Sequence, residues 1–278
     1  MYQTLISVDK LKQDFNAKTW VIIDCRFDLS DPTKGHRLYE DAHIPEAFFM
    51  DLEQDLSSHI TPVSGRHPLP DPEHFAKKAA EAGVTLSSQV VVYDDCKGAM
   101  ASRAWWLFRQ IGVKNVAVLE GGYSAWLASG GEVTEEPKLP ISDPDVALPL
   151  FDVAGTFNTE QVFNHLHEIQ LVDARDPARF RGEVEPIDRV AGHIPGAINR
   201  PFSANFDESG DFKQPQQLKE EWAALINVNK SVVHMCGSGV TACHNILSME
   251  HAGLTQSLLY ADSWSEWIRD DARPIEKG

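Results

Sequence analysis

The stretch Ser231-Val-Val-His-Met-Cys-Gly-Ser-Gly-Val-Thr-Ala242 decides the fold of the second half of this chain. Ser231–Met235 is a short apolar run without alternation, which is typical of a strand buried on both faces of a parallel sheet. Two glycines follow it, and residues 241–251 have the spacing of an amphipathic helix. Strand, loop and helix in this order predict a βαβ unit in an α/β fold.

Cys236 opens the loop at the carboxyl end of this predicted strand, where parallel sheets place their ligands. The loop glycines allow a tight curl because glycine tolerates positive φ. A curled loop that opens a helix directs backbone N–H groups inward at the positive end of the helix dipole. Cys236 is therefore expected to be a thiolate nucleophile in an anion-binding cradle. The cradle residues are Gly237, Ser238, Gly239, Val240 and Thr241.

The first half of the chain repeats the second half, with matching segments in the same order about 140–150 residues apart. The matches pair residues 21–26 with 171–175, 42–47 with 192–197, 90–94 with 231–236, and 121–126 with 262–267. This pattern predicts two tandem α/β domains, each a mostly parallel sheet flanked by helices. We expect a first domain at 1–132, an extended linker rich in proline and acidic residues at 133–150, and a second domain at 151–278. Residues 61–71 form an insertion in the first copy.

Composition excludes several classes of protein. The 278 residues carry a formal net charge of -16, which argues against nucleic acid or an anionic membrane as the main partner. An anionic substrate would then need local positive charge at the site. The first residues do not resemble a signal peptide, and no apolar run approaches the length of about 18 residues expected of a membrane span. Four cysteines without a close pair favour a reducing, cytoplasmic location.

The loop Cys-Gly-Ser-Gly-Val-Thr-Ala at 236–242 resembles the active-site loop of rhodanese-superfamily sulfurtransferases of the 3-mercaptopyruvate type. The His-Ile-Pro-Gly-Ala segment at 193–197 and the Ser-Trp-Ser-Glu-Trp segment at 263–267 also recur in that family. The resemblance implies two tandem rhodanese-like domains and no metal or organic cofactor. It also implies a Cys236 persulfide that passes sulfur to cyanide, a small thiol or a protein dithiol such as thioredoxin. A duplicated chain of this kind needs no partner subunit, so we expect a monomer.

Only the second copy carries the nucleophile in that family, and this chain agrees. The cysteine position of the first copy holds Asp94, and Cys96 stands in a segment without the cradle pattern, so Cys96 is interpreted as non-catalytic. His43 and His193 occupy matching positions in both copies. Because one copy has no nucleophile, both histidines are expected to be structural, with a ring nitrogen bonded to backbone. Trp126 and Trp267 are likewise expected in the core.

The charge of the residues after Cys236 indicates which sulfur donor the protein uses. Thiosulfate-type enzymes of the family carry arginine and lysine after the cysteine, whereas this chain has the neutral Gly237 and Ser238. Neutral positions favour 3-mercaptopyruvate, whose carboxylate lies far from its sulfur and needs an arginine. By resemblance, Arg179 matches the family's substrate-binding arginine, and Arg189 is the nearest candidate for the second. The alternative is that these arginines form surface ion pairs, with Glu183 or Glu185 as partners.

The resemblance also implies a proton relay. Its serine matches Ser238, its histidine matches His67 in the insertion, and its carboxylate matches Glu53. Such a relay could move protons as sulfur leaves the donor. Arg66 adds positive charge beside His67. The alternative is that His67 only packs or hydrogen-bonds in an ordered loop.

Four other functions compete with this interpretation. A thiosulfate:cyanide sulfurtransferase uses the same chemistry with another donor, and a sulfur carrier would bind sulfur without turnover. A cysteine phosphatase needs an arginine six residues after the cysteine, where this chain has Ala242. A metal site would lack the tight paired spacings of zinc proteins. Its ligands would be His234, Cys236, Cys243 and His244; we expect Cys243 instead to be a buried thiol.

Overall fold

The computed structural model describes residues 1–16, 18–142, 147–151, 155–227, 229–255 and 257–278. The chain falls into two compact units, Met1–Ser58 with Pro70–Asp152, and His59–Leu69 with Val153–Gly278. Residues His59–Leu69, which overlap the predicted insertion at 61–71, therefore belong with the second unit rather than with the sequence around them. The predicted bounds 1–132 and 151–278 do not anticipate this exchange.

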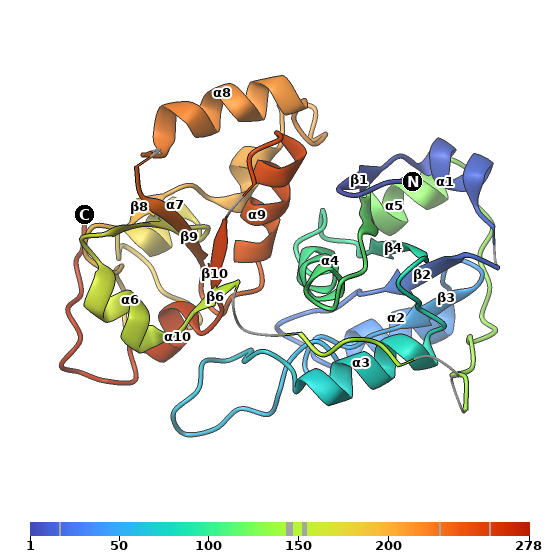
Figure 1. The fold of residues 1–278 in the computed structure, drawn as a ribbon, viewed down its shortest axis with the longest axis horizontal. Helices are drawn as coiled ribbons and strands as arrows, with labels where there is room; N and C mark the ends of the chain where they lie inside the picture. Colours follow the sequence, from blue (N-terminus) through green and yellow to red (C-terminus); the bar gives the residue numbers. More distant parts are fainter. Residues whose placement is uncertain (17, 143–146, 152–154, 228, 256) are drawn as a thin grey trace. The chain divides into compact units, whose positions relative to one another are not determined.

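The first unit contains one five-stranded sheet in the order β1-β5-β4-β2-β3 among the described residues, and its strand pairs are parallel (Figure 1). Its elements are β1 (Leu5–Ile6), α1 (Val8–Asp14), β2 (Trp20–Asp24), α2 (Lys34–Asp41), β3 (Ala47–Phe49), α3 (Pro72–Glu81), β4 (Gln89–Tyr93), α4 (Ala101–Gln110), β5 (Asn115–Leu119) and α5 (Gly122–Ala128). The second unit repeats this plan in the order β6-β10-β9-β7-β8, again with parallel pairs. Its elements are β6 (Thr156–Phe157), α6 (Thr159–His165), β7 (Ile169–Asp173), α7 (Pro177–Phe180), β8 (Ile198–Asn199), the 3-10 helix η1 (Phe202–Asn205), α8 (Pro215–Leu225), β9 (Ser231–Met235), α9 (Ala242–His251), β10 (Leu258–Tyr260) and α10 (Ser263–Trp267).

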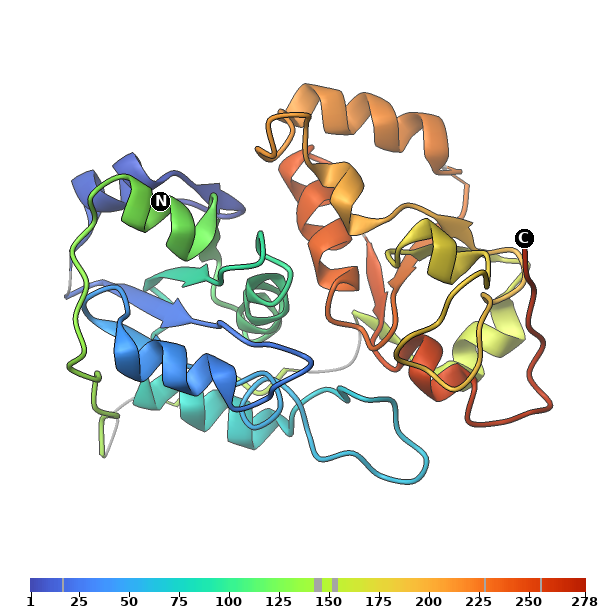
Figure 2. The ribbon, with the colours of Figure 1, turned by 180° about the vertical axis from the view of Figure 1, so that it is seen from behind.

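Both sheets have helices on both faces, as the view from behind shows (Figure 2). In the second unit, alternate residues of β9 enter different cores, because successive side chains of a strand point to opposite faces. Val233 and Met235 pack in a cluster with Trp264 and Trp267 of α10. Val232 packs in a second cluster with residues of α8 and α9. A strand buried on both faces explains the absence of alternation in its sequence.

The described part of the predicted linker packs more closely than an extended, solvated linker would. Thr134 forms an antiparallel bridge with His43, and the backbone N–H of Ile141 donates to the carbonyl of Glu81 at 2.9 Å. Leu148 is buried. Residues 143–146 lie outside the described residues. The described linker residues therefore contribute contacts to the first unit.

The paired histidines and tryptophans are structural, as the sequence predicts. The ring of His43 bonds the carbonyls of Tyr39 at 2.6 Å and Glu136 at 3.0 Å, and His193 Nδ1 bonds the carbonyl of Phe180 at 2.8 Å. Trp126 and Trp267 are both buried. No helix in the described part of the chain is both long and apolar enough to span a membrane.

Candidate active site

The Cys236 loop joins β9 to α9 at the carboxyl edge of the second sheet. Cys236 and Ser238 are 2% and 6% exposed. Gly239 has φ +79°, and a Cβ built on it would lie 2.2 Å from the carbonyl oxygen of Ala261. Only glycine fits both the left-handed backbone and this close approach. The predicted curl of the loop is therefore present, and the segment after β10 fixes it from one side.

The first turn of α10 holds the loop in place. The backbone N–H groups of Trp264 and Ser265 donate to the carbonyls of Cys236 at 3.1 Å and Gly237 at 2.9 Å. The hydroxyl of Ser263 accepts from the Cys236 N–H at 3.1 Å and donates to the carbonyl of Tyr260 at 2.8 Å. Ser263 has φ 56°, a left-handed conformation that is uncommon outside glycine. The sequence analysis missed its role, although the first copy has Gly122 at φ 57° in the matching place.

The first copy shows what a loop of this kind binds. Asp94 stands at the cysteine position, directly after β4, and is fully buried. Its carboxylate accepts four backbone hydrogen bonds of 2.7–2.9 Å. The donors are the N–H groups of Cys96, Gly98, Met100 and Ala101. Burial raises the pKa of Asp94, while these hydrogen bonds oppose the rise. The turn from strand to helix in the first copy thus surrounds an anion with N–H donors.

The other cysteines have surroundings that disfavour a thiolate. Burial, followed by the charge of Asp24, raises the pKa of Cys25 well above its ordinary value. Burial and the charge of Asp94 likewise raise the pKa of Cys96, so its thiol stays protonated at neutral pH. Cys243 is buried on α9 and donates its Sγ–H to the carbonyl of Gly239 at 3.3 Å. These contacts agree with the interpretation of Cys96 and Cys243 as non-catalytic thiols.

His67 reaches the loop. Its Nδ1 lies 2.7 Å from the Oγ of Ser238, and its side chain is only 4% exposed. The segment that carries it is anchored beside it, because the N–H of Arg66 donates to the Oγ of Ser265 at 3.0 Å. His67 and Ser238 are therefore brought together, as the relay predicts. Glu53 belongs to the first unit, where its N–H donates to the side chain of Asp51 at 2.8 Å, and its part in a relay stays a prediction.

Two arginines lie beside the loop. A Cβ built on Gly237 would lie 2.8 Å from Nη2 of Arg66, and 3.6 and 3.7 Å from Nη2 and Nη1 of Arg179. Arg179 comes from α7, which follows the neighbouring strand β7, so the parallel order of the sheet explains its position. Arg179 also donates to Glu185 at 2.7 Å and to Asp188 at 3.1 Å. The ion pair that the sequence analysis offered as the alternative to substrate binding thus exists beside the loop itself.

The carboxylates behind these arginines differ in their electrostatics. Burial acts to raise the pKa of Glu185, but hydrogen bonds from Arg179 and from two backbone N–H groups outweigh it and leave the pKa below its ordinary value. Burial raises the pKa of Asp188, against the charge of Arg66, which lowers it. Both side chains are 4% exposed. Glu185 is thus the more firmly ionised of the two.

Arg189, the candidate for the second arginine, makes its contacts with residues other than the loop. Its guanidinium donates to the carbonyl of Ile268 and pairs with Asp271 at 2.9 Å, and its side chain is 52% exposed. The arginine that accompanies Arg179 at Gly237 is Arg66 instead. Spacing from Arg179 could not reveal this, because Arg66 comes from a distant segment of the chain.

The side chains of the competing metal site have separate partners. His234 Nε2 lies 3.2 Å from the sulfur of Met249, and His244 Nδ1 lies 2.9 Å from the amide nitrogen of Asn205. The part of the chain that the structure describes contains no group of three or more histidine, cysteine or acidic side chains that could hold a metal ion. The contacts of His234 and His244 are those of a packed interior.

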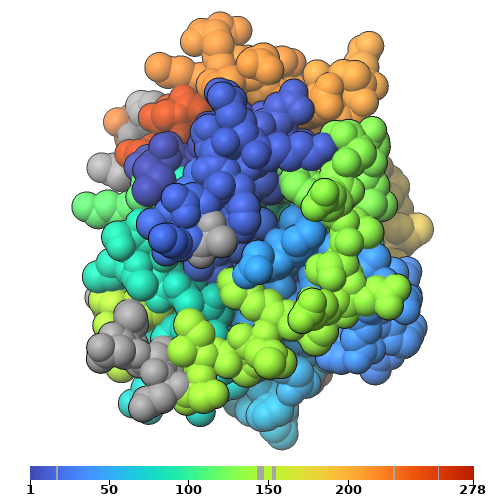
Figure 3. All heavy atoms as spheres, turned by 90° about the vertical axis from the view of Figure 1, so that its right-hand side faces the viewer, coloured from blue at the N-terminus to red at the C-terminus, as the bar shows by residue number. Residues whose placement is uncertain are grey.

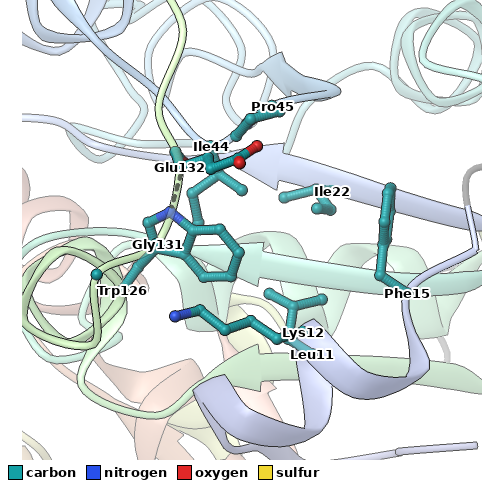
Figure 4. A pocket seen from close by; sticks show the side chains of 10 residues that line it. Leu11, Lys12, Phe15, Ile22, Ile44, Pro45, Trp126, Gly131 and Glu132 are labelled. Carbon is teal, nitrogen blue, oxygen red and sulfur yellow. Dashed lines mark hydrogen bonds between the residues drawn. The ribbon is translucent and has the colours of Figure 1, made fainter.

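The first unit has an apolar cavity of about 430 Å³ between α1 and the segment after α5. Figure 4 shows the ring of Trp126 and the side chain of Lys12 at one end and Phe15 at the other. Lys12 Nζ lies 5.2 Å from the centre of the Trp126 ring and donates to the carbonyl of Ser129 at 2.8 Å. The N-terminal segment and the chain after α5 also lie side by side on the surface in Figure 3. Lys12 and Glu132 are its charged lining residues, and no cysteine, serine or threonine is among the described residues that line it.

Comparison with known proteins agrees with this geometry. The Rhodanese-like domain family matches residues 7–129 and 158–270. The "Probable 3-mercaptopyruvate sulfurtransferase" of Pseudomonas aeruginosa is 45% identical over 283 residues, which cover 99% of this chain and 98% of that protein. The "Putative thiosulfate sulfurtransferase SseB" of Mycobacterium tuberculosis is 37% identical over 286 residues, with 99% and 98% covered.

Solved structures match as well. The crystal structure of SseA from Escherichia coli, described as a 3-mercaptopyruvate sulfotransferase, has a TM-score of 0.79 and 31% identity, and the match covers 95% of this chain and all of that one. The 3-mercaptopyruvate sulfurtransferase from Leishmania major has a TM-score of 0.81 and 28% identity, with 95% of this chain and 74% of that one covered. Both copies of the domain and relatives that match along the whole chain show that this protein belongs to the rhodanese family and is a tandem-domain sulfurtransferase.

Proposed function

We propose that this protein takes sulfur from 3-mercaptopyruvate onto Cys236, releases pyruvate, and passes the sulfur to a thiol or cyanide acceptor. The observation that carries the proposal is the position of the guanidinium groups of Arg66 and Arg179 beside the neutral Gly237, the residue that follows the buried Cys236. An arginine fork suits a carboxylate, and a neutral loop suits a donor whose charge lies far from its sulfur.

The chemistry balances without a cofactor. The Cys236 thiolate attacks the sulfur of the donor, the carbon–sulfur bond breaks, and its electron pair remains on carbon as the enolate of pyruvate. The donor's thiol proton ends on that carbon, so a persulfide anion and pyruvate are formed. Ser238 and His67, in contact at 2.7 Å, are placed to carry this proton. The N–H groups of the loop would stabilise the persulfide anion, as those of the first copy stabilise Asp94.

The second half-reaction returns the enzyme to its thiolate. A protein dithiol such as thioredoxin would reduce the persulfide, leaving the Cys236 thiolate, hydrogen sulfide and an oxidised disulfide. We include such a dithiol in the proposal, with cyanide and small thiols as simpler acceptors. We propose also that the protein acts as a monomer in the cytoplasm, on the grounds of its composition and its duplicated chain.

A single experiment tests the proposal. Pyruvate release from 3-mercaptopyruvate and thiocyanate formation from thiosulfate and cyanide are measured for the wild type and for Cys236→Ser. We expect a preference for 3-mercaptopyruvate and complete loss in the variant, because a hydroxyl cannot form the persulfide. A preference for thiosulfate would keep Cys236 and overturn the donor assignment. Absence of turnover with both donors would favour a sulfur carrier.

A further inference from the structure

Arg66 and Arg179 present unpaired donors to the same point of the loop. Nη2 of Arg66 and Nη1 of Arg179 lie 2.8 and 3.7 Å from the Cβ position of Gly237. Neither nitrogen has a hydrogen-bond partner among the residues that the structure describes, because the contacts of each guanidinium use its other nitrogens. Two N–H groups aimed at one point beside a nucleophile make an anion subsite.

Asp188 joins the two arginines. One oxygen of its carboxylate accepts from Nη1 of Arg66, and the other accepts from Nη2 of Arg179 at 3.1 Å. Glu185 accepts from Nε of Arg179 at 3.0 Å and from the same Nη2 at 2.7 Å. These four side chains carry two positive and two negative charges. The neighbouring ion pair, Arg175 with Asp173 at 2.7 Å, also has no net charge. Without Asp188 the cluster would have one net positive charge, and without Arg66 one net negative charge.

We propose that Arg66 is the second arginine that binds the donor, and that Asp188 sets the net charge of this subsite and so selects a singly charged donor over doubly charged thiosulfate. This inference rests on the proposed function. The energy of an anion in the field of the site is proportional to its charge, so a change in local charge affects a dianion twice as strongly as a monoanion. 3-Mercaptopyruvate has one carboxylate and a neutral thiol, whereas thiosulfate carries two charges. A neutral cluster with two directed donors favours the former.

Asp188→Asn and Arg66→Met test this assignment because they change the charge in opposite directions. Asp188→Asn should raise the ratio of kcat/KM for thiosulfate to kcat/KM for 3-mercaptopyruvate about tenfold, since the added positive charge favours the dianion. Arg66→Met should lower the kcat/KM for 3-mercaptopyruvate about 10- to 100-fold, through the loss of a charged hydrogen bond. Arg66→Met should also lower the ratio of kcat/KM for thiosulfate to kcat/KM for 3-mercaptopyruvate, because the lost positive charge disfavours the dianion. Arg189→Met is the matched control, because Arg189 pairs with the exposed Asp271.

Opposite shifts of the ratio are a readout that a structural role would not produce. Equal losses with both donors in both variants, or unchanged kinetics in Arg66→Met, would overturn the inference. If Asp188→Asn fails to fold, Arg66→Lys provides the second test. It keeps the charge but loses the fork, so the KM should rise by a similar factor for both donors and the donor ratio should stay near the wild-type value. A rise in that ratio would contradict the charge argument.

Binding of pyruvate separates this inference from the proposed function. Pyruvate has the donor's carboxylate and no sulfur, so calorimetry of wild type and Arg66→Met reports the subsite without turnover. Weaker pyruvate binding in Arg66→Met alongside a wild type that does not use 3-mercaptopyruvate would overturn the function and keep the subsite. Equal binding alongside normal turnover would overturn the subsite alone.

Discussion

Gly239 links the sequence of the loop to its geometry. Its φ of +79° costs a residue with a side chain about 1–2 kcal/mol, and its Cβ would meet the carbonyl oxygen of Ala261 at 2.2 Å. A displaced loop would move Cys236 relative to the turn of α10 that holds it. The conformation of this one residue therefore governs the position of the nucleophile.

Gly239→Ala should lower both stability and turnover. Gly253→Ala is the control, because Gly253 has φ +75° with nothing within 4 Å of its Cβ position. The control should lose about 1–2 kcal/mol from its backbone conformation alone. Gly239→Ala should lose about 1–3 kcal/mol more, through crowding against the Ala261 carbonyl. Urea unfolding measures the difference, and equal losses in the two variants would show that the loop relaxes without cost.

His67→Asn tests the proton relay. Sulfur transfer from 3-mercaptopyruvate requires a proton to reach carbon, whereas transfer from thiosulfate releases sulfite without one. The variant should therefore lower kcat for 3-mercaptopyruvate about 100-fold and leave thiosulfate turnover near the wild-type value. An equal loss with both donors would mean that His67 only holds Ser238 and the loop in place.

Sequence reasoning located part of this site and missed the rest for a physical reason. Cys236 and its loop are local in sequence, so the glycine pattern after a buried strand predicts them. Arg66 lies in the first half of the sequence. The residue spacing within the second half therefore could not predict its position beside Gly237. Proximity in sequence to Arg179 favours Arg189 as the second arginine, yet Arg189 pairs with Asp271.

At the scale of elements, the strand and helix of the active loop were predictable to within a few residues. β9 is Ser231–Met235 as expected, and the predicted helix at 241–251 begins one residue later, at Ala242. Burial on both faces leaves a clear signal in the sequence of a strand. The positive φ of Ser263 leaves none, because its hydroxyl bonds to Cys236 and Tyr260 arise only after folding.

β9 also contains an acid-sensitive residue. His234 is fully buried, and burial lowers its pKa from 6.5 to about 3, with a smaller effect from the charge of Arg200. Its Nδ1 has no hydrogen-bond partner among the described residues, and Trp222 packs edge-on against its ring at 5.5 Å. Between pH 6.5 and 3 the unfolded chain binds a proton there that the folded chain does not. Stability should therefore fall as the pH falls through this range.

His234→Leu should remove this sensitivity. The free energy of unfolding of the wild type should fall by about 1.4 kcal/mol per pH unit more steeply than that of the variant below pH 6.5. At pH 7 and above the two should differ little in slope, because the imidazole is neutral in both states. Chemical denaturation at several pH values measures both slopes, and parallel curves between pH 6 and 4 would contradict the buried, neutral state of His234.

At the scale of the whole molecule, a strongly acidic chain must bind an anionic donor. The net charge of -16 predicts a need for local positive groups, and Arg66 and Arg179 supply guanidinium donors beside Gly237, although Asp188 and Glu185 balance their charge. Duplication of the domain explains how the chain obtained both the Cys236 loop and the segment that carries Arg66. One copy keeps the cysteine, while the other has Asp94 in its place and contributes the segment His59–Leu69 to the second unit. Most of the predicted insertion at 61–71 thus belongs to the unit that carries Cys236.

Gly65→Ala tests whether this segment serves the second unit. A Cβ on Gly65 would lie 2.6 Å from the carbonyl oxygen of Asp262 and 2.9 Å from the Oγ of Ser265. The added methyl group should push the segment away from α10 and weaken the bond from the Arg66 N–H to Ser265. Because His67 and Arg66 would both move, turnover of 3-mercaptopyruvate should fall at least about tenfold.

Stability should change far less than activity, since the segment contributes little to either hydrophobic core. Ser64→Ala is the control, because the Oγ of the half-buried Ser64 bonds to Thr61 and to the carbonyl of Gly65 within the same turn, and the variant should leave turnover unchanged. Steady-state pyruvate release and thermal unfolding measure the two effects. Full activity in Gly65→Ala would mean that the second unit forms its active site without a fixed position for this segment, and the roles assigned to Arg66 and His67 would then both fail.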